Sequence, residues 1–246
     1  MVVRLPNADC YAGQVEKEWR WLPQLAPLLP LVIPQPLALA KATSGFPRPW
    51  AVYRWIEGTT ARAFSGAMSS ATASVLGGFL AAVQRLPLQD GPTPGQHSFG
   101  RGGPLSAYDG EVGQALAKLR PFAKSDVAVE IWQQALESAS SRTTWLHGDV
   151  APANLILRGN RLVAVIDWGL CAVGDPSCDI AIAWSSFGPE ARADFRYALA
   201  PDDATWARGR GWALWKALIV LAELAGTDPR QRQIAAQSLA QVLADW

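Results

Sequence analysis

A short β-hairpin interrupts a long helical region in the second half of the chain, and polar residues gather at both of its ends. The apolar runs Leu155–Leu157 and Leu162–Ile166 flank Arg158–Arg161, a turn whose central Gly-Asn pair tolerates positive φ. Because a hairpin places its two ends side by side, residues before its first strand must lie near those after its second. The spacing of apolar residues predicts helices near Leu105–Leu119, Asp126–Ser138, Asp175–Ser186, Glu190–Leu199, Asp203–Leu224 and Arg230–Leu243.

Three of the polar residues at the hairpin ends form a pattern typical of phosphoryl transfer. Asp149 and Asn154 lie in the loop that enters the hairpin, and Asp167 follows its second strand. We expect Asn154 and Asp167 to converge on one point, with Asp149 close by. Two oxygen ligands together with phosphate oxygens suit Mg²⁺, which protein side chains seldom hold alone. A separate carboxylate can orient an attacking hydroxyl or accept its proton, which is the division of roles that phosphoryl transfer requires.

The first sixty residues read as strand, helix, strand, strand. A strand at Val2–Leu5 precedes a helix from Tyr11 to about Ala26, and the aromatic and β-branched run Trp50–Ile56 predicts a buried strand. The apolar residues expected on the core face of the helix are Val15, Trp19, Leu22 and Ala26. A helix follows at Ala71–Leu86. The Gly- and Pro-rich stretch Leu86–Pro104 then predicts a long surface loop. Its segment Phe99–Gly103 is not a phosphate-binding loop, because it follows no strand.

Composition excludes several classes of protein. Half of the residues are hydrophobic, so the chain can bury a core and is not a disordered protein. Lys and Arg number 22 against 21 Asp and Glu, a balance that favours neither nucleic acid nor a membrane surface as partner. The three cysteines have no CxxC spacing, which argues against disulfides and zinc and predicts reduced thiols in the cytoplasm. No stretch has the length and apolarity of a membrane span.

The motifs resemble those of a known family. HGDVAPAN at 147–154 and IDWG at 166–169 look like the H-G-D-x-x-x-x-N and I-D-[WF]-G signatures of the aminoglycoside phosphotransferase family, small-molecule relatives of the protein kinases. GDPSCDIA at 174–181 is similar to a third motif of that family. The resemblance implies an α+β, protein-kinase-like two-lobed fold with a mostly helical C-lobe. It also implies ATP or GTP as the phosphoryl donor and Mg²⁺ as the metal.

The resemblance assigns roles to the residues at the hairpin ends and at a hinge. Asp149 is implied as the catalytic base, and Asn154 and Asp167 as the Mg²⁺ ligands. The hinge that hydrogen-bonds adenine through its backbone falls at Arg54, Trp55 and Ile56. The acceptor is a small molecule with a hydroxyl group, and the family includes enzymes that act on antibiotics.

Four further residues have expected roles in support of the site. Arg4 falls where the family has the basic residue of a strand, and Glu18 falls where its ion-pair partner lies; both are implied in nucleotide binding. His147 can be a base, a metal ligand or a structural residue that hydrogen-bonds the loop, and the last is favoured. Asp179 sits in the apolar run CDIAIAW, where a buried acid needs partners, and the backbone around His147 and Asp149 is the candidate. Asp175 before Pro176 reads as a helix N-cap.

Two departures from the family pattern leave alternatives open. The basic residue is an arginine where kinases generally have lysine, and the chain starts at the family's third strand, so the first two strands and the Gly-rich loop are expected to be lacking. The expected parts are a partial N-lobe at 1–53, a hinge at 54–58 and a helical C-lobe at 59–246. The main function expected is ATP-dependent O-phosphotransfer to an aminoglycoside or other antibiotic; the alternative is a pseudokinase or a remnant that binds ligand without turnover.

An acidic acceptor pocket would suit cationic antibiotics. The late helices offer acids that could line such a pocket, namely Glu190, Asp194, Asp202, Asp203 and Glu223. Their positions relative to one another are not visible in the sequence. The sequence also leaves the oligomeric state open.

Overall fold

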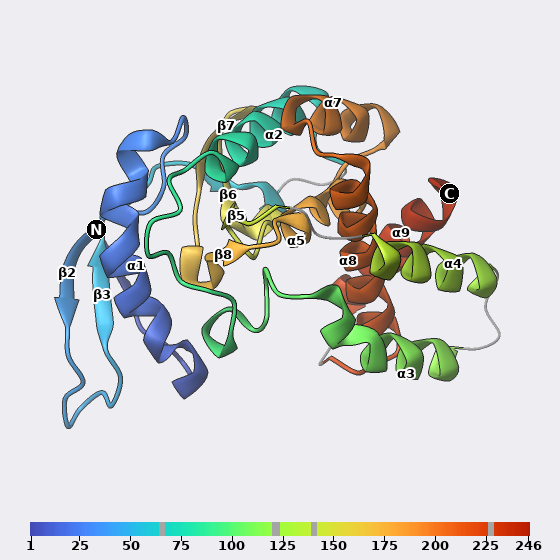
Figure 1. Ribbon diagram of the computed structural model, residues 1–246. Coiled ribbons are helices and arrows are strands. Elements are labelled where there is room, and N and C mark those ends of the chain that lie inside the picture. The colour runs from blue at the N-terminus through green and yellow to red at the C-terminus, as the bar shows by residue number, and fades with distance from the viewer. Residues whose placement is uncertain (64–66, 120–123, 139–141, 226–228) are drawn as a thin grey trace.

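The computed structural model describes residues 1–63, 67–119, 124–138, 142–225 and 229–246. A small sheet with one helix forms one end of the molecule, and a group of helices forms the other (Figure 1). Short strands lie between them, and helices α2 and α7 cover this middle part along one side. The mixture of small sheets and many helices agrees with the α+β class expected from the sequence.

The N-terminal sheet contains β1 (Val2–Arg4), β2 (Pro36–Ala40) and β3 (Trp50–Tyr53) in the antiparallel order β1-β3-β2. Opposite residues of an antiparallel pair share a face, and Arg4 pairs with Ala51 two residues from the pair of Val2 and Tyr53. Arg4 and Tyr53 therefore project from the same face. Helix α1 (Ala12–Leu25) lies against this sheet. Both predicted strands are confirmed but are shorter than expected.

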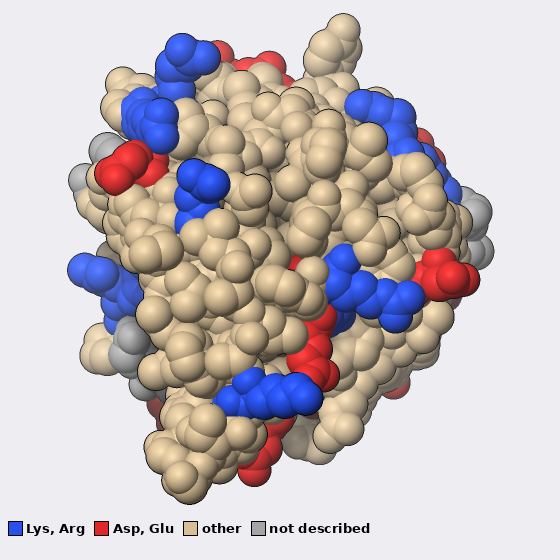
Figure 2. All heavy atoms as spheres, turned by 90° about the vertical axis from the view of Figure 1, so that its left-hand side faces the viewer, with Lys and Arg blue, Asp and Glu red and all other residues tan. Residues whose placement is uncertain are grey.

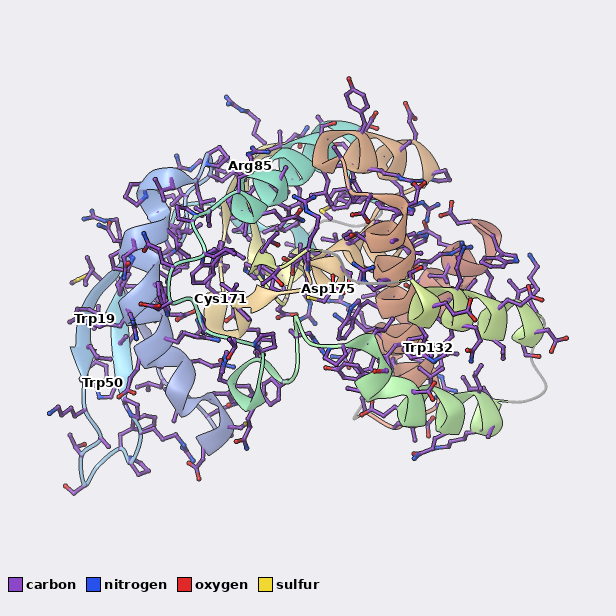
Figure 3. All side chains as sticks on the ribbon, viewed as in Figure 1. Trp19, Trp50, Arg85, Trp132, Cys171 and Asp175 are labelled. Atoms are coloured by element: carbon purple, nitrogen blue, oxygen red, sulfur yellow. The ribbon has the colours of Figure 1, made fainter. Side chains whose placement is uncertain are left out.

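One detail of the predicted helix face is wrong. The structure buries Val15 and Leu22 as expected, but Trp19 is 39% exposed, and Trp21 is buried in its place. Trp21 packs edge-on against Trp145, with ring centroids 5.2 Å apart. Residues two positions apart on a helix lie on different faces, so Trp19 and Trp21 do not both face the core. Contact with a distant part of the chain decides which of the two is buried. Figure 3 shows Trp19 and Trp50 at the outer end of the molecule.

The predicted hairpin is β6 (Leu155–Arg158) and β7 (Arg161–Val165). Strand β4 (Thr59–Thr60) pairs with β6, and β5 (Thr144–Leu146) pairs with β8 (Ala172–Gly174). The hairpin is tied to the N-terminal part by Val32, whose N–H donates to Val163 O and whose carbonyl accepts from Val165 N–H, at 3.1 and 3.0 Å. The hairpin thus contacts the N-terminal part as well as β4 and α2 in the middle of the molecule.

Helices α2 (Ser70–Gln84) and α7 (Pro189–Leu199) pack together, and α8 is central to the helical end. Helix α8 (Asp203–Leu221) contacts the helices α3 (Asp109–Leu119), α4 (Ser125–Glu137), α5 (Ser177–Ile180), α6 (Ile182–Ser186) and α9 (Pro229–Ala244). The single helix expected at Asp175–Ser186 is two, because 3₁₀-type bonds from Ala181 N–H to Cys178 O and from Trp184 N–H to Ala181 O interrupt it.

The segment Leu86–Pro104 is more enclosed than the surface loop expected from its composition. Its carbonyls at Pro92 and Gly102 accept from Val173 N–H and Asp175 N–H, each at 2.8 Å, so the segment lies along β8. Ser98 within it is fully buried. Among the described residues, no helix has the length and apolarity needed to cross a membrane.

Candidate active site

A buried carboxylate holds the loop that follows β5. Asp179, on α5, is 2% exposed. Its Oδ2 accepts from His147 N–H and its Oδ1 from Gly148 N–H, both at 2.7 Å. Gly148 has φ of +85°, and a Cβ there would lie 2.5 Å from Leu170 O, so a side chain cannot fit. Burial raises the pKa of the Asp179 carboxyl. The loop backbone is therefore fixed by charge-assisted bonds in the core.

His147 has no ring nitrogen left for chemistry. Its Nε2 lies 3.0 Å from Ile166 O, to which it must donate, and its Nδ1 accepts from Asp149 N–H at 3.2 Å. The imidazole is fully buried and lies edge-on to Trp168, with centroids 4.9 Å apart. Of the roles that the sequence left open, this arrangement favours the structural one, because one neutral tautomer satisfies both partners.

Hydrogen bonds to Asp149 orient the side chain of Asn154. Its Nδ2 donates to Asp149 O at 2.9 Å and to Asp149 Oδ2 at 3.0 Å. Because both partners are acceptors, the amide cannot be turned round, and its Oδ1 faces away from Asp149. Asn154 O accepts from Ile166 N–H at 2.8 Å, which brings Asn154 beside the residue that precedes Asp167. The register of the hairpin brings these residues together.

Asp167 links the hairpin to the N-terminal sheet. It adopts a left-handed conformation with φ of 65°, unusual for a residue other than glycine and often found at functional sites. Its Oδ1 accepts from Arg4 Nη2, and Arg4 Nη1 donates to Glu18 Oε1 at 2.7 Å. Glu18 is fully buried on α1 and accepts from Tyr53 Oη at 2.5 Å. Burial raises the pKa of the Glu18 carboxyl and of the Tyr53 hydroxyl.

The donor set at the end of the hairpin fits Mg²⁺ bound together with a nucleotide. Among the described residues, no group of three or more His, Cys, Asp or Glu side chains could hold a metal ion by itself. The Asp167 carboxylate, whose side chain is 45% exposed, and the outward amide oxygen of Asn154 offer two oxygen ligands. Magnesium commonly keeps water and phosphate as its remaining ligands, so two protein oxygens are sufficient.

The three residues predicted to form the hinge, Arg54, Trp55 and Ile56, differ in their hydrogen bonds and in their exposure. Arg54 N–H donates to Gln35 O at 2.9 Å and Arg54 Nε donates to Gln35 Oε1 at 2.8 Å, so this amide is not available to an adenine. The hydrogen bond predicted between the Arg54 backbone and an adenine is therefore left to the Arg54 carbonyl. Trp55 is 53% exposed. Arg54 and Ile56 line a cavity of about 390 Å³ together with Val32, Ile33, Gln35, Ala26, Pro27, Leu29, Pro30 and Leu31.

Two polar contacts near the site were not expected from the sequence. Lys17 Nζ donates to Cys171 O at 2.9 Å and lies 2.8 Å from His97 Nδ1, which ties α1 to the segment before α3. Burial lowers the pKa of Lys17. Arg208 on α8 binds Asp175 through Nε at 2.7 Å and Nη2 at 3.2 Å. The Arg208 side chain is 4% exposed, and a charged residue within an apolar helical run was the only available signal.

Asp175 lies one residue before the N-cap of α5, which is Pro176 and not Asp175 as the sequence indicated. Its Oδ1 accepts from Ser177 N–H at 3.1 Å. The bond from Ser177 N–H and the pairing with Arg208 are compatible because one carboxylate has lone pairs for both. Figure 3 shows Asp175 in the middle of the molecule and Trp132 among the helices beyond it.

The acids of the late helices serve local roles. Asp203 pairs with Arg196 at 2.6 Å with its side chain 96% exposed, and Glu223 pairs with Arg232 on the surface. Asp202 caps α8 by accepting from Thr205 N–H at 2.6 Å. These contacts do not bring the three acids together into a pocket.

Comparison with known proteins gives both a family and a fold. A model of the phosphotransferase enzyme family matches residues 1–212. A structure of APH(2″) in complex with GDP and kanamycin is similar with a TM-score of 0.73 and 18% identity, over 99% of this chain and 86% of that one. The apoenzyme of macrolide 2′-phosphotransferase MphH from Brachybacterium faecium gives a TM-score of 0.62 and 21% identity, over 96% and 83%.

A third similar structure contains a nucleoside triphosphate. The ternary complex of streptomycin, ATP and APH(2″)-IIa gives a TM-score of 0.59 and 17% identity, over 98% of this chain and 84% of that one. No curated protein matches the chain at a significant level. The structural matches confirm the prediction of a protein-kinase-like α+β fold.

Proposed function

The chain belongs to the phosphotransferase enzyme family, and on this basis we propose that it is an ATP-dependent O-phosphotransferase acting on a hydroxyl group of a small molecule. The observation that supports this most directly is the arrangement of Asp149, Asn154 and Asp167 at the ends of one hairpin. Asn154 contacts Asp149 through its amide nitrogen, which leaves its amide oxygen for another ligand. One site therefore offers a base and a separate pair of metal ligands.

In the proposed reaction Asp149 orients the acceptor hydroxyl and takes its proton as the oxygen forms a bond to the γ-phosphorus of ATP. The bond between that phosphorus and the β–γ bridging oxygen breaks, and ADP leaves. Asn154 and Asp167 would hold Mg²⁺, which would neutralise charge on the nucleotide phosphates. Arg4 is held by Glu18 and offers its guanidinium to the same phosphates. His147 and Asp179 keep the loop in position from within the core. Positioning and charge neutralisation supply most of the catalysis in this class of reaction.

On the same basis we propose that the chain is divided into two lobes joined by a hinge. Residues 1–53 form the nucleotide-side lobe, 54–58 form the hinge, and 59–246 form the acceptor-side lobe. Adenine would then contact the Arg54 carbonyl and the backbone of Trp55 and Ile56. ATP is the proposed donor, with GTP as the alternative, because similar enzymes have been solved with ATP and with GDP. We place the enzyme in the cytoplasm, where ATP is present.

Antibiotics are the first acceptors to test, because similar structures carry kanamycin, streptomycin and gentamicin, and one is a macrolide phosphotransferase. The purified chain would be incubated with Mg·ATP and each compound, with ADP release and the phosphorylated product measured by mass spectrometry. Reactions with EDTA and reactions without acceptor are the controls. Metal-dependent product from at least one small-molecule hydroxyl is expected. A chain that neither binds nor consumes Mg·ATP would contradict the proposal.

A further inference from the structure

Arg101 lies on an aromatic cluster that no role assigned above uses. Its guanidinium carbon is 5.8, 5.0 and 4.8 Å from the ring centroids of Tyr108, Trp212 and Trp215. Nη1 of Arg101 donates to Tyr108 Oη at 3.1 Å. The three rings are buried and pack against one another, with centroids between 4.6 and 5.4 Å apart. Stacking on three rings restricts the guanidinium to one place.

The charge of Arg101 has no carboxylate partner among the described residues. No carboxylate oxygen there lies within 4.0 Å of its nitrogens, and the guanidinium donates to the neutral Tyr108 hydroxyl. Glu111 accepts from Trp215 Nε1 at 2.7 Å and so is bound on the indole side. No described buried side-chain nitrogen lacks a partner, so the unused N–H groups of Arg101 reach solvent. A fixed cation with free donors is available for a ligand.

Two of the other stacked arginines have an acid beside them, whereas Arg20 over Trp21 and Arg210 over Trp246 form no ion pair among the described residues. Arg196 lies 4.9 Å from the centroid of Trp206 but also binds the Asp203 carboxylate at 2.6 Å. Arg192 lies 5.8 Å from the centroid of Trp184, and its Nε is 3.8 Å from Asp245. In both, a nearby acid compensates the charge that the ring orients.

Arg101 lies on the helical side of the loop that carries Asp149. Its neighbour Gly102 accepts from Asp175 N–H at 2.8 Å, and a Cβ on Gly102 would lie 2.6 Å from Leu146, the residue before His147. Trp212 Nε1 donates to Ser177 Oγ at 3.1 Å on the helix of Asp179. The proposed nucleotide contacts, Arg4 and Asp167, lie toward the N-terminal sheet. The proposed function has the acceptor approach from this helical side, on which the Arg101 cluster lies.

We propose that Arg101 is a specificity-determining residue that binds an anionic group, a carboxylate or a phosphate, on the small-molecule acceptor. This inference rests on the proposed function. A guanidinium offers two parallel N–H donors that match the geometry of either group, and its place on the rings is already fixed. The same fixed charge opposes a polycation, so a compound such as kanamycin would be a poor acceptor for this chain.

Three sugars of one ring type test the charge preference directly. Glucuronate, glucose and glucosamine present similar hydroxyl groups with a negative, neutral or positive substituent. Binding is followed by ¹⁹F NMR of protein labelled with 5-fluorotryptophan, with the Trp212 and Trp215 signals assigned by Trp→Phe variants. We expect glucuronate to bind about tenfold to a hundredfold more tightly than glucosamine, as a hydrogen-bonded charge pair provides. Equal binding of the three sugars, or no change in either signal, would overturn the proposal without any variant at position 101.

Variants then assign the preference to Arg101. Arg101→Gln should lose most of the affinity for glucuronate, and Arg101→Glu should shift the preference to glucosamine. Arg196→Gln is the matched control, because it removes a stacked arginine that already has its carboxylate, and it should leave sugar binding unchanged. Wild-type preference that persists in both Arg101 variants would place the anion site elsewhere and refute the inference.

The two proposals fail in different ways. A chain that prefers glucuronate through Arg101 but neither binds nor consumes Mg·ATP keeps the anion site and contradicts the proposed function. A chain that phosphorylates kanamycin at the same rate with and without Arg101 keeps the function and contradicts this inference.

Discussion

The loop that carries Asp149 is held by hydrogen bonds inside the core, whereas the N-terminal sheet reaches the same site through one partly exposed arginine. Asp179 and His147, which hold the loop, are 2% and 0% exposed. The side chains of Arg4 and Asp167, which join the sheet to the hairpin, are 33% and 45% exposed. Buried bonds to charge are worth more than exposed ion pairs. The loop of Asp149 is therefore held from within the core. Strand β1 reaches the same site through the partly exposed ion pair of Arg4 and Asp167, beside the backbone bonds of Val32 and the buried bond of Lys17 to Cys171 O.

The two regions also differ in how far their apolar side chains are exposed. On the N-terminal sheet, Val3 is 54% exposed, and Leu5 just beyond it is 53% exposed. Figure 2 shows this end of the molecule, where most atoms belong to uncharged residues and the charged side chains form small separate groups. Trp145 and Trp168, by contrast, are fully buried beside the loop. The packing that stabilises the site lies mainly on the side of the loop.

Replacing Asp179 by Ala should have the largest effect on stability. The change leaves His147 N–H and Gly148 N–H buried without an acceptor, which costs about 2–5 kcal/mol. Urea unfolding followed by tryptophan fluorescence measures it. Glu190→Ala, at an exposed position of α7, is the control and should change little. A loss for Asp179→Ala no larger than that of the control would show that the loop is not held from the core.

Replacing Asp167 by Ala should mainly affect the nucleotide side. Mg·ATP affinity is expected to fall at least ~10²-fold, or about 2.7 kcal/mol, because the anionic metal ligand is lost. The stability of the protein should change much less than in Asp179→Ala, since the Asp167 side chain is 45% exposed. Calorimetric titration with Mg·ATP and with ATP in EDTA separates the two effects. Unchanged Mg·ATP affinity would remove Asp167 from the site.

Replacing Glu18 by Gln should have the smallest effect, and the effect should depend on pH. Glutamine keeps an oxygen for Arg4 and a polar group for Tyr53, so below pH 4.5, the ordinary pKa of the Glu18 carboxyl, the change costs about 1 kcal/mol or less. Burial raises the pKa of Glu18 in the folded state, so the folded protein binds more protons than the unfolded chain above that pH. The stability of wild type relative to Glu18→Gln should therefore decrease as pH rises through the raised pKa.

Urea unfolding of both proteins over this range of pH tests the sign. A wild-type advantage that grows with pH would mean that Arg4 keeps the Glu18 carboxyl ionised, and that the N-terminal contact is held more firmly than the comparison implies.

The parts of the site that depend on local geometry could be predicted from the sequence. The hairpin brings Asn154 beside the residue before Asp167 because the register of a hairpin follows from its turn and its apolar pattern. The acid of CDIAIAW could be expected to find backbone partners because a buried carboxylate without them is too costly. Each of these predictions depends only on residues that lie close together in the sequence.

The parts of the structure that depend on contacts between distant segments could not be predicted from the sequence. Whether Trp19 or Trp21 faces the core depends on Trp145, and the partner of Asp175 is Arg208 on another helix. Arg101 stacks on rings more than a hundred residues later in the chain. Spacing within a helix shows that a face exists but does not show what covers it.

The claim that the rigid loop presents a catalytic base is tested most directly by Asp149→Asn. The substitution keeps the size of the side chain and an oxygen that can accept from Asn154 Nδ2, but it removes the group that takes the proton. With the acceptor that reacts fastest in the panel, kcat should fall at least ~10²-fold, while the dissociation constant for Mg·ATP stays nearly the same. Equal turnover by Asp149→Asn and wild type would contradict the assignment of Asp149 and with it the proposed mechanism.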